Sequence, residues 1–508
     1  MSPIPPATRL DATRLDAKRL DVRMLLPAAL AVSLALAIAS INPVGYIGGG
    51  SDDWQYLEAA RCAVREGFCV PHSHWAARLP LVLPTAAVLS VLGESRAHIM
   101  LVPIAYGLAA IVLFVSVVQR AAGRMAAALG GAALAVTPMV GGELTALNVS
   151  TVEFFWAIAA VFAWQRALPA RHRGLAALAG AALGLALLSR ATAFAFLPIC
   201  ALGLVFATRE TRALILPALL GLAAILLLEA GLYTALTGDP FHGWALSLGH
   251  TRLASSENPV AHLAASPILN RFVIAGWERP MGIHVHWMID GALNLLADPT
   301  IAPTLWAALV LLFLGRDENV RVPLLLLGAA CLYFGALTYG LAIDPKPRMF
   351  VPVAAAACAI FGMRGARLWR EGGRPLVLAV LALLTLNAAA IAYNKLDLRP
   401  LERTAARWAA PDMAINETAR RVLTLAPQVR RLPVLPATAT HLLTVSIGAC
   451  TADAPWSLVR SHRFGMTDPA PLAALRARGL GLGPVQPLAL CEFRRDRAAS
   501  GREVGPRS

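Results

Sequence analysis

Two adjacent carboxylates open the first polar segment of the chain. Asp52 and Asp53 follow the run Gly48-Gly49-Gly50, and Tyr56 and Glu58 come one to two helical turns later. A carboxylate beside a reacting group can remove a proton from a hydroxyl, and a second one can orient that hydroxyl or hold a cation. A structural alternative stays open, because Asp at a helix start accepts the free N–H groups of the first turn.

The segments around this acidic group are apolar enough to cross a membrane. Of the 508 residues, 57% are hydrophobic and 15% are charged, whereas a soluble domain carries about 25% charged residues. The formal net charge is +15, but no Arg-rich run is interleaved with aromatics as in a single-strand nucleic-acid groove. We therefore expect an all-α polytopic membrane domain with about eleven transmembrane helices.

The apolar blocks and the arginines between them predict the topology. We place spans at about 24–41, 97–118, 125–141, 152–165, 174–188, 192–207, 213–236, 300–315, 322–343, 349–363 and 375–393. Alternate gaps are rich in arginine, which is retained on the cytoplasmic side. The tail 1–23 is then a cytoplasmic basic segment. The arginines of the cytoplasmic gaps are Arg120, Arg124, Arg166, Arg171, Arg173, Arg209, Arg212, Arg316, Arg321, Arg364, Arg367, Arg370 and Arg374.

One apolar block, residues 79–92, is left out of the span count. It is short, contains two prolines and ends at Gly93. Counting it would place the later arginine clusters outside, so we expect an interfacial or re-entrant helix on the outer face. The membrane domain covers 24–393, with large external loops at 42–96 and 237–300.

The cysteines favour the same topology. Cys200, Cys331 and Cys358 fall within predicted spans. The other four fall in predicted external segments and can pair as Cys62 with Cys69 and Cys450 with Cys491. Disulfides persist on the oxidising side of a membrane, so we expect both pairs to form.

The first external loop resembles that of the GT-C glycosyltransferases. This superfamily includes the protein O-mannosyltransferases and the aminoarabinose transferases that act on lipid A. The loop has the acidic pair, the following Tyr56 and Glu58, a turn at Gly67, a basic residue before a Pro-Leu amphipathic helix, and a closing turn. The basic residue is Arg78, the helix begins at Leu79-Pro80-Leu81, and the closing turn is Leu92-Gly93-Glu94.

Three later segments resemble further motifs of the same superfamily, in order and spacing, so that the resemblance covers about residues 45–365. They are Leu188-Ser189-Arg190, Thr237-Gly238-Asp239-Pro240-Phe241 and Lys346-Pro347-Arg348-Met349-Phe350-Val351-Pro352. The superfamily often has Asp-Glu where this chain has Asp-Asp. Its second external loop commonly supplies another Asp, for which this chain offers Glu153, with Glu143 as the alternative.

The resemblance implies a reaction and roles for these residues. The donor would be a sugar on a polyprenyl phosphate, and Asp52 would act as the general base on the acceptor, giving inversion at the anomeric carbon. Arg78, Arg348 and Arg190 would stabilise the leaving phosphate, because the guanidinium is a fixed fork of donors. Snorkelling of each arginine to lipid headgroups is the alternative. The resemblance also implies a bacterial inner membrane, and the arginine topology then places the C-terminal domain in the periplasm.

The histidines suggest, but do not establish, a metal site. His72 with His74 and His284 with His286 form His-x-His pairs in external loops, and such spacing can place two ligands on one face. Histidine beside Trp75 or Trp287 at a membrane interface is the commoner arrangement. We therefore assign no metal ligands and no certain cofactor, and leave a divalent cation at the acidic cluster as an open alternative.

Residues 394–508 are expected to form a small extracytoplasmic α/β domain tied by Cys450 and Cys491. A helical stretch is expected at Pro411–Leu425, and apolar runs lie near 432–449 and 484–493. The net positive charge of this segment suits an anionic membrane surface or an acidic glycan acceptor. A spacer without a catalytic role is the alternative.

Two other functions compete with sugar transfer. A transporter or flippase for a lipid-linked glycan would place its ionisable groups at mid-membrane and show internal repeats. Here the acidic residues gather at one interface and no repeat is evident. A non-catalytic envelope assembly protein is the third interpretation.

Overall fold

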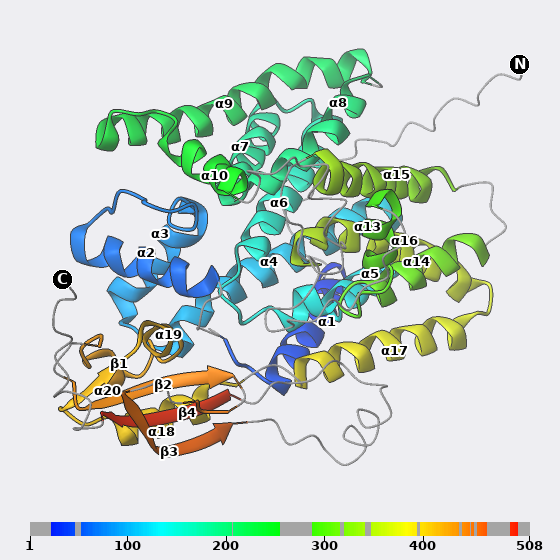
Figure 1. Cartoon of the computed structure of the whole chain (residues 1–508). Coiled ribbons are helices and arrows are strands. Elements are labelled where there is room, and N and C mark those ends of the chain that lie inside the picture. The colour runs from blue at the N-terminus through cyan, green and yellow to red at the C-terminus, as the bar shows by residue number, and fades with distance from the viewer. Residues whose placement is uncertain are drawn as a thin grey trace, which may run out of the picture.

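The computed structural model describes residues 22–45, 52–205, 207–253, 287–314, 320–340, 347–393, 397–435, 439–447, 449–451, 455–464 and 488–495. It contains a helical bundle followed by a small sheet with flanking helices, which lies below the bundle in Figure 1. The residues Gly48-Gly49-Gly50, Lys346, His284 and His286 lie outside the described residues.

A helix lies over every apolar segment that the sequence predicts to span the membrane. These helices are α1 Val22–Ile41, α4 Arg96–Ala122, α5 Arg124–Ala135, α6 Val149–Ala170, α7 Arg173–Ser189, α8 Leu197–Val205, α9 Arg209–Thr237, α14 Ala302–Leu314, α15 Arg321–Gly335, α16 Val351–Arg370 and α17 Arg374–Tyr393. Short π or 3-10 segments extend four of them: η1 Pro138–Gly142, η2 Ala191–Phe196, η3 Ala336–Gly340 and η4 Pro347–Phe350.

Among the described residues, 5 helices are long and apolar enough to cross a membrane on length and composition. They are Arg96–Ala122, Arg209–Thr237, Arg321–Gly340, Pro347–Arg370 and Arg374–Tyr393, and several shorter apolar helices pack with them. The chain is therefore a multi-pass membrane protein. The count of about eleven spans stays a prediction.

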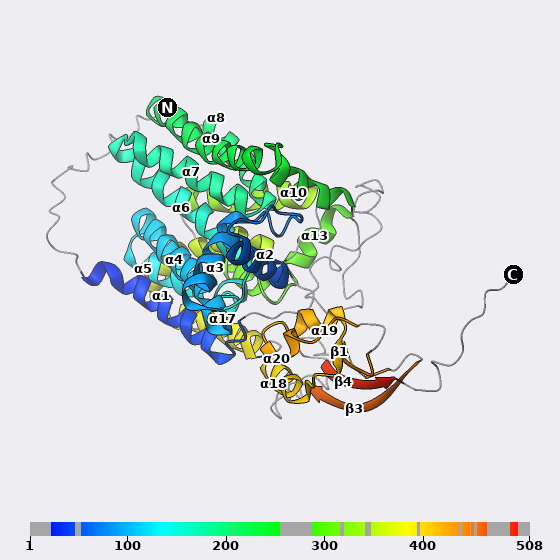
Figure 2. The same cartoon turned by 90° about the vertical axis from the view of Figure 1, so that its left-hand side faces the viewer.

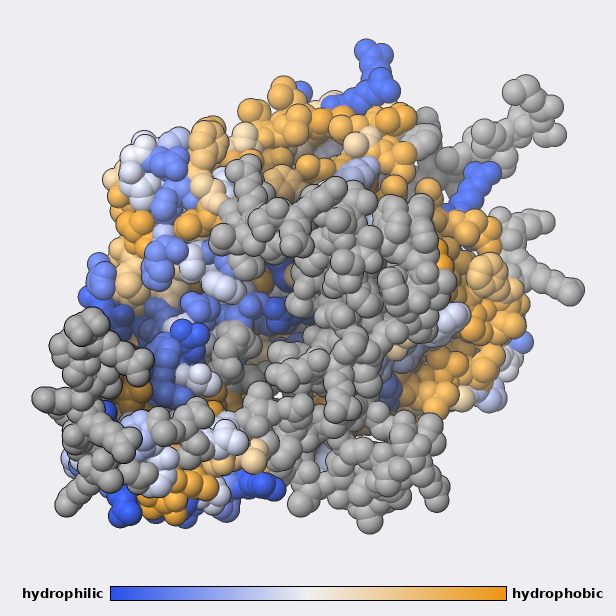
Figure 3. Space-filling model, in the orientation of Figure 1, coloured by the Kyte–Doolittle hydropathy of each residue, from blue (hydrophilic) through white to orange (hydrophobic). Residues whose placement is uncertain are grey.

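The outside of the bundle is suited to lipid. On α9, Leu227 and Leu228 are 70% and 71% exposed, and hydrophobic atoms cover the edge of the molecule formed by α9 in Figure 3. Water would not tolerate so continuous an apolar band, whereas hydrocarbon does. The exposed leucines therefore fit a lipid-facing helix.

Small residues let the helices approach closely. A Cβ at Gly180 of α7 would lie 1.7 Å from the backbone oxygen of Ala218, and one at Gly221 of α9 would lie 1.9 Å from that of Ala177. Such contacts replace the hydrophobic driving force that is missing between helices in lipid. They hold α7 against α9.

Two helices of the segment 42–96, the predicted first external loop, cover one end of the bundle. α2 spans Asp52–Glu66 and α3 spans Leu79–Leu92, and α3 packs on α4, α6 and α7. Figure 2 looks onto this end, where α2 lies near α10 (His242–Leu253). The Cys62–Cys69 disulfide is present at the end of α2. The helix that the sequence predicts at 79–92 is confirmed as a helix, and its depth in the membrane stays a prediction.

The C-terminal part combines helices with a four-stranded sheet. Its elements are α18 Arg399–Trp408, β1 Met413–Ile415, α19 Glu417–Val422, α20 Pro427–Arg430, β2 His441–Ile447, β3 Trp456–Phe464 and β4 Leu488–Arg495. The strand order is β1-β2-β4-β3; β1 pairs parallel to β2, and β4 pairs antiparallel to both neighbours. The Cys450–Cys491 disulfide is present beside β4.

One sequence prediction in this part is wrong. A helix was expected over Pro411–Leu425, but residues 413–415 form β1 and the helix α19 starts only at Glu417. All three β1 residues are buried, because the strand lies between the β2 edge and the helices. Asn416 then caps α19 by accepting from the N–H of Ala419 at 2.8 Å, which fixes the switch from strand to helix.

Candidate active site

Asp52 is held by side chains from two distant segments. Its Oδ1 accepts a hydrogen bond from Trp75 Nε1 at 2.9 Å, and its Oδ2 pairs with Arg348 of η4. Asp53 Oδ1 instead accepts from the N–H of Trp54 at 3.0 Å. Asp53 thus contacts the first turn of α2, while the Asp52 carboxylate is engaged in tertiary contacts.

The charge of Asp52 is set by opposing effects. Burial alone would raise its pKa, but the positive charge of Arg348 and the hydrogen bond from Trp75, with Arg190 and His74 further off, hold the pKa below its usual value. Asp52 is therefore ionised across the neutral range. An anion that draws Arg348 away would make this carboxylate a stronger base.

Tyr56 lies one turn along α2 and is only 2% exposed. Burial raises the pKa of its hydroxyl to about 12, and the charge of Asp52 adds to the increase, while Arg78, Arg190 and Arg348 act against it. Tyr56 is therefore a neutral hydroxyl in the middle of these four charged groups. It can donate a hydrogen bond without acting as a base.

Three arginines from separate segments approach the same region. Arg78 precedes α3, Arg190 separates α7 from η2, and Arg348 lies in η4. Arg78 and Arg190 are 9% and 7% exposed, and Arg190 Nη1 donates to Ser150 Oγ at 2.7 Å. The charges of Arg78, Arg190 and Arg348 all act on Tyr56.

Two of these guanidinium groups have unused donors. The Nε atoms of Arg78 and Arg348 are buried and have no hydrogen-bond partner among the described residues. Buried polar groups are nearly always hydrogen-bonded, so each such donor calls for an acceptor. A phosphate supplies several acceptor oxygens at once.

Glu153 is the second carboxylate of this cluster. It lies on α6, is 3% exposed, and accepts from Thr192 Oγ1 at 2.7 Å. Arg78 and Arg190 both interact with it electrostatically. Glu143, the alternative acid, follows η1 and is half-buried in the loop before α6. The structure thus associates Glu153 with Arg78 and Arg190.

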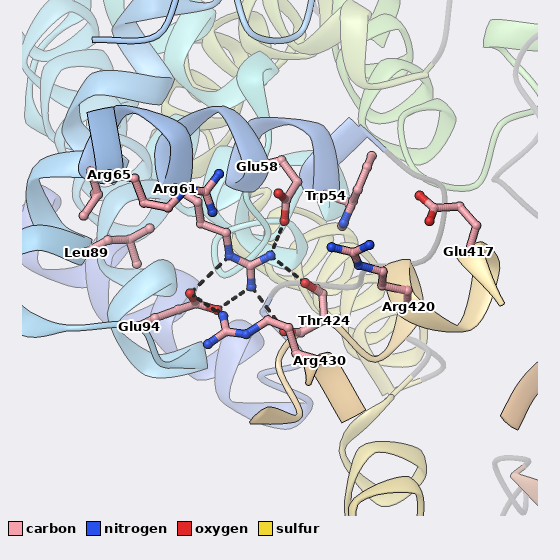
Figure 4. Close-up of a pocket in the computed structure, with 11 residues that line it drawn as sticks. Trp54, Glu58, Arg61, Arg65, Leu89, Glu94, Glu417, Arg420, Thr424 and Arg430 are labelled. Carbon is pink, nitrogen blue, oxygen red and sulfur yellow. Dashed lines mark hydrogen bonds and ion pairs between the residues drawn. The ribbon is translucent and has the colours of Figure 1, made fainter. Parts of the chain in front are cut away.

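Glu58 belongs to a different cluster. It pairs with Arg61 one turn away on α2, and Arg61 also pairs with Glu94, which follows α3. Arg61 further donates to Thr424 at the end of α19, at 2.6 Å to Oγ1 and 3.2 Å to the carbonyl oxygen. Figure 4 shows Arg61 at the centre of these contacts.

This second cluster joins the external loop to the C-terminal part. Arg430 of α20 also pairs with Glu94, at 2.8 Å, and Arg421 of α19 stacks over the ring of Trp54 at 4.8 Å. Among these residues, Arg61, Glu94 and Arg430 line a cavity of about 620 Å³. Sequence reasoning missed Arg61; its spacing of three from Glu58 was the available signal.

The histidine and cysteine groups do not make a metal centre in the described part of the chain. The group of Cys62, Glu66 and Cys69 has suitable spacing, but its two cysteines form a disulfide and offer no thiolate. His74 stacks on Trp75 with ring centroids 3.7 Å apart, and His72 is exposed.

Comparisons with known proteins give a family match over part of the chain and a fold match over most of it. Residues 80–233 match the family model of dolichyl-phosphate-mannose-protein mannosyltransferase. No curated protein matches the chain.

Solved structures share the fold. The Archaeoglobus fulgidus oligosaccharyltransferase in complex with Zn and sulfate matches with a TM-score of 0.55 at 13% identity, covering 82% of this chain and 67% of its own. Its apo form gives a TM-score of 0.52 at 14% identity, with 82% and 65% covered. ArnT from Cupriavidus metallidurans in the apo state matches at a TM-score of 0.48 and 16% identity, with 91% and 97% covered.

The family match covers the region from α3 to α9, which carries Arg190 and Glu153. The fold match extends over most of the chain. Both agree with the resemblance read from the sequence motifs. Over residues 80–233 the chain is similar to a family of GT-C membrane glycosyltransferases, and over most of its length it has the fold of the archaeal oligosaccharyltransferase.

Proposed function

We propose that this protein transfers a sugar from a polyprenyl-phosphate donor to an acceptor hydroxyl at the extracytoplasmic face of a bacterial inner membrane. The observation that carries this proposal is that Asp52 and Arg348 pair beside Arg78 and Arg190. Of these three arginines, Arg78 and Arg348 have a buried Nε donor without a hydrogen-bond partner among the described residues. A base next to phosphate-binding groups is what such a transfer needs. The matched family is named for a dolichyl-phosphate-mannose donor, which is a sugar of this kind.

The reaction that we propose follows from these positions. The donor phosphate binds the arginines and competes with Asp52 for Arg348. Asp52 takes the proton of the acceptor hydroxyl, whose oxygen attacks the anomeric carbon on the face opposite the phosphate. The bond from that carbon to the phosphate oxygen breaks, and the polyprenyl phosphate leaves with the electron pair, so the configuration inverts.

The other residues have supporting roles in this proposal. Glu153 balances the charge of Arg78 and Arg190, and the hydroxyl of Tyr56 donates to the donor or the acceptor. Glu58 acts through Arg61 rather than on substrate. Asp53 positions the start of α2.

The arginine-bearing gaps support the orientation that we propose. Arg120, Arg124, Arg209, Arg321 and Arg374 all lie at helix ends opposite to the first external loop in the alternating topology. We propose that 1–23 is cytoplasmic, 24–393 is the membrane domain, and 394–508 lies outside. The last part lies on the same side as α2, because Arg61 contacts Thr424.

The test is sugar transfer by purified protein in lipid nanodiscs. Radiolabelled undecaprenyl-phosphate sugars are offered together with an envelope glycolipid extract, and Asp52→Asn is compared with Asp412→Asn, an exposed aspartate of the C-terminal part. We expect Asp52→Asn to lower transfer by about 10²–10⁴-fold and Asp412→Asn to leave it unchanged. Full transfer by a folded Asp52→Asn protein would refute the assignment of the base.

A further inference from the structure

A second cavity lies where the C-terminal part meets the ends of two membrane helices. Its volume is about 570 Å³, which is within the usual range for ligand sites. Ile41 at the end of α1 and Tyr393 at the end of α17 line it. Asn42 Nδ2 donates to the carbonyl oxygen of Tyr393 at 3.5 Å, so the two ends are adjacent. In the predicted topology these ends lie at the outer surface of the bilayer.

Positive side chains dominate the opposite wall. Arg403 and Arg407 are one turn apart on α18, and Arg463 lies on the edge strand β3 beside His462. All three arginines are exposed. The wall thus presents several guanidinium groups next to the membrane surface.

The acidic groups nearby are already paired with other arginines. Asp397 pairs with Arg399 at 2.8 Å, and Glu402 pairs with Arg96 at 2.6 Å. Within the described part of the chain, Arg403 and Arg463 make no ion pair, and Arg407 donates only to Thr404 Oγ1, at 3.2 Å. The cavity therefore keeps an excess of positive charge.

The remaining wall is apolar. Leu398, Leu401, Phe464 and Leu488 line it together with Ile41. A ligand that fits both walls carries a negative charge on one end and hydrocarbon on the other. Anionic phospholipids at the bilayer surface have this chemistry, and arginines near the surface attract them.

We propose that this cavity binds the phosphate headgroup of an anionic phospholipid in the leaflet at the ends of α1 and α17. Binding fastens α18 and β3 to the membrane surface and so fixes the C-terminal part beside the first external loop. The proposal requires only that these helix ends lie at a bilayer surface. It does not depend on sugar transfer.

The test measures lipid retention by the full chain in phosphatidylcholine nanodiscs that contain a minor fraction of phosphatidylglycerol. Native mass spectrometry gives the apparent Kd for phosphatidylglycerol. The variant Arg403→Gln/Arg407→Gln is compared with Arg431→Gln/Arg494→Gln, which removes the same charge from exposed arginines of the C-terminal part outside the cavity. We expect about fivefold weaker binding for each cavity arginine removed, so about 30-fold for the first variant, and less than about twofold for the second.

Equal losses in both double variants would overturn the proposal, because the effect would then be one of net charge. If the first variant does not fold, Arg463→Gln takes its place. We expect this variant to bind phosphatidylglycerol about fivefold more weakly, and unchanged binding would refute the site. Inorganic phosphate is added as a competitor. Displacement of the lipid at equal concentration would show a site for soluble phosphate and overturn the lipid assignment.

Discussion

Replacing Arg61 should loosen the C-terminal part from the first external loop. Arg61 is 8% exposed and donates to Glu58, Glu94 and both oxygens of Thr424. A hydrogen bond to a charged group contributes about 1.5–3 kcal/mol. Glu58 and Glu94 keep 35% and 23% of their side-chain surface exposed, so water replaces part of what Arg61→Gln removes. We expect a loss of about 2–4 kcal/mol in the docking free energy.

The assay is amide hydrogen exchange of α19 and α20 in nanodiscs. A loss of about 2 kcal/mol raises exchange through undocking by about 30-fold. Arg65→Gln is the matched control, because Arg65 lies one turn later on α2, is exposed, and makes no ion pair among the described residues. Equal exchange in the two variants would refute the docking role of Arg61.

The same contact predicts a pH dependence. Burial would raise the pKa of Glu94, but its bonds and charge contacts with Arg61 and Arg430 hold the pKa below 4.5. A carboxyl with a lowered folded-state pKa stabilises the docked state above its unfolded value, and this stabilisation is lost as pH falls through the lowered pKa. Docking by Glu94 is therefore complete at neutral pH and fails in strong acid. In Arg61→Gln the loss should begin at higher pH.

Three further changes test other parts of the structure. Arg348→Gln should lower kcat/KM by about 10²–10³-fold. It should also move the acidic limb of the pH–rate profile to higher pH, because Arg348 is the main group that lowers the pKa of Asp52. An acidic limb at the same pH would contradict that pairing. Cys450→Ser/Cys491→Ser removes a disulfide with a sequence separation of 41. It should destabilise the C-terminal sheet by about 4 kcal/mol, measured by thermal unfolding, and a reductant should not change the melting temperature of this variant. Gly180→Ala should lower the free energy of unfolding by about 1–3 kcal/mol, because the new Cβ meets the backbone of Ala218. Gly231→Ala on α9 should cause no loss, because nothing lies within 4 Å of its Cβ position. Equal melting temperatures of the two variants would contradict the close approach of α7 and α9.

The helical elements were readable from the sequence because hydrophobic blocks and arginine gaps are local signals. The helix at 79–92 could be separated from the spans only through the arginine alternation that follows it. The same reasoning could not find β1, because Met413-Ala414-Ile415 has no period of its own and is a strand only through its parallel pairing with β2. The helix expected at Pro411–Leu425 was wrong for this reason.

The residues of the site were named from motifs, but their grouping depends on tertiary structure. The motifs did not indicate that Arg348 pairs with Asp52, or that Trp75 donates to it, because these residues lie far apart in the chain. They also did not indicate that Glu58 pairs with Arg61. Glu153 was preferred over Glu143 from the motif alone, but its electrostatic contact with Arg78 and Arg190 could not be predicted, because these residues lie on separate segments.

Extracytoplasmic sugar transfer is tested most directly by finding the side of the membrane on which α2 and the C-terminal part lie. Single cysteines are placed at Asp412 and, on the predicted cytoplasmic side, at Glu210, after Cys200, Cys331 and Cys358 are replaced by serine. A membrane-impermeant maleimide added to intact spheroplasts should label Asp412→Cys at once and Glu210→Cys only after permeabilisation. Labelling in the reverse pattern would place Asp52 on the cytoplasmic side and contradict extracytoplasmic sugar transfer.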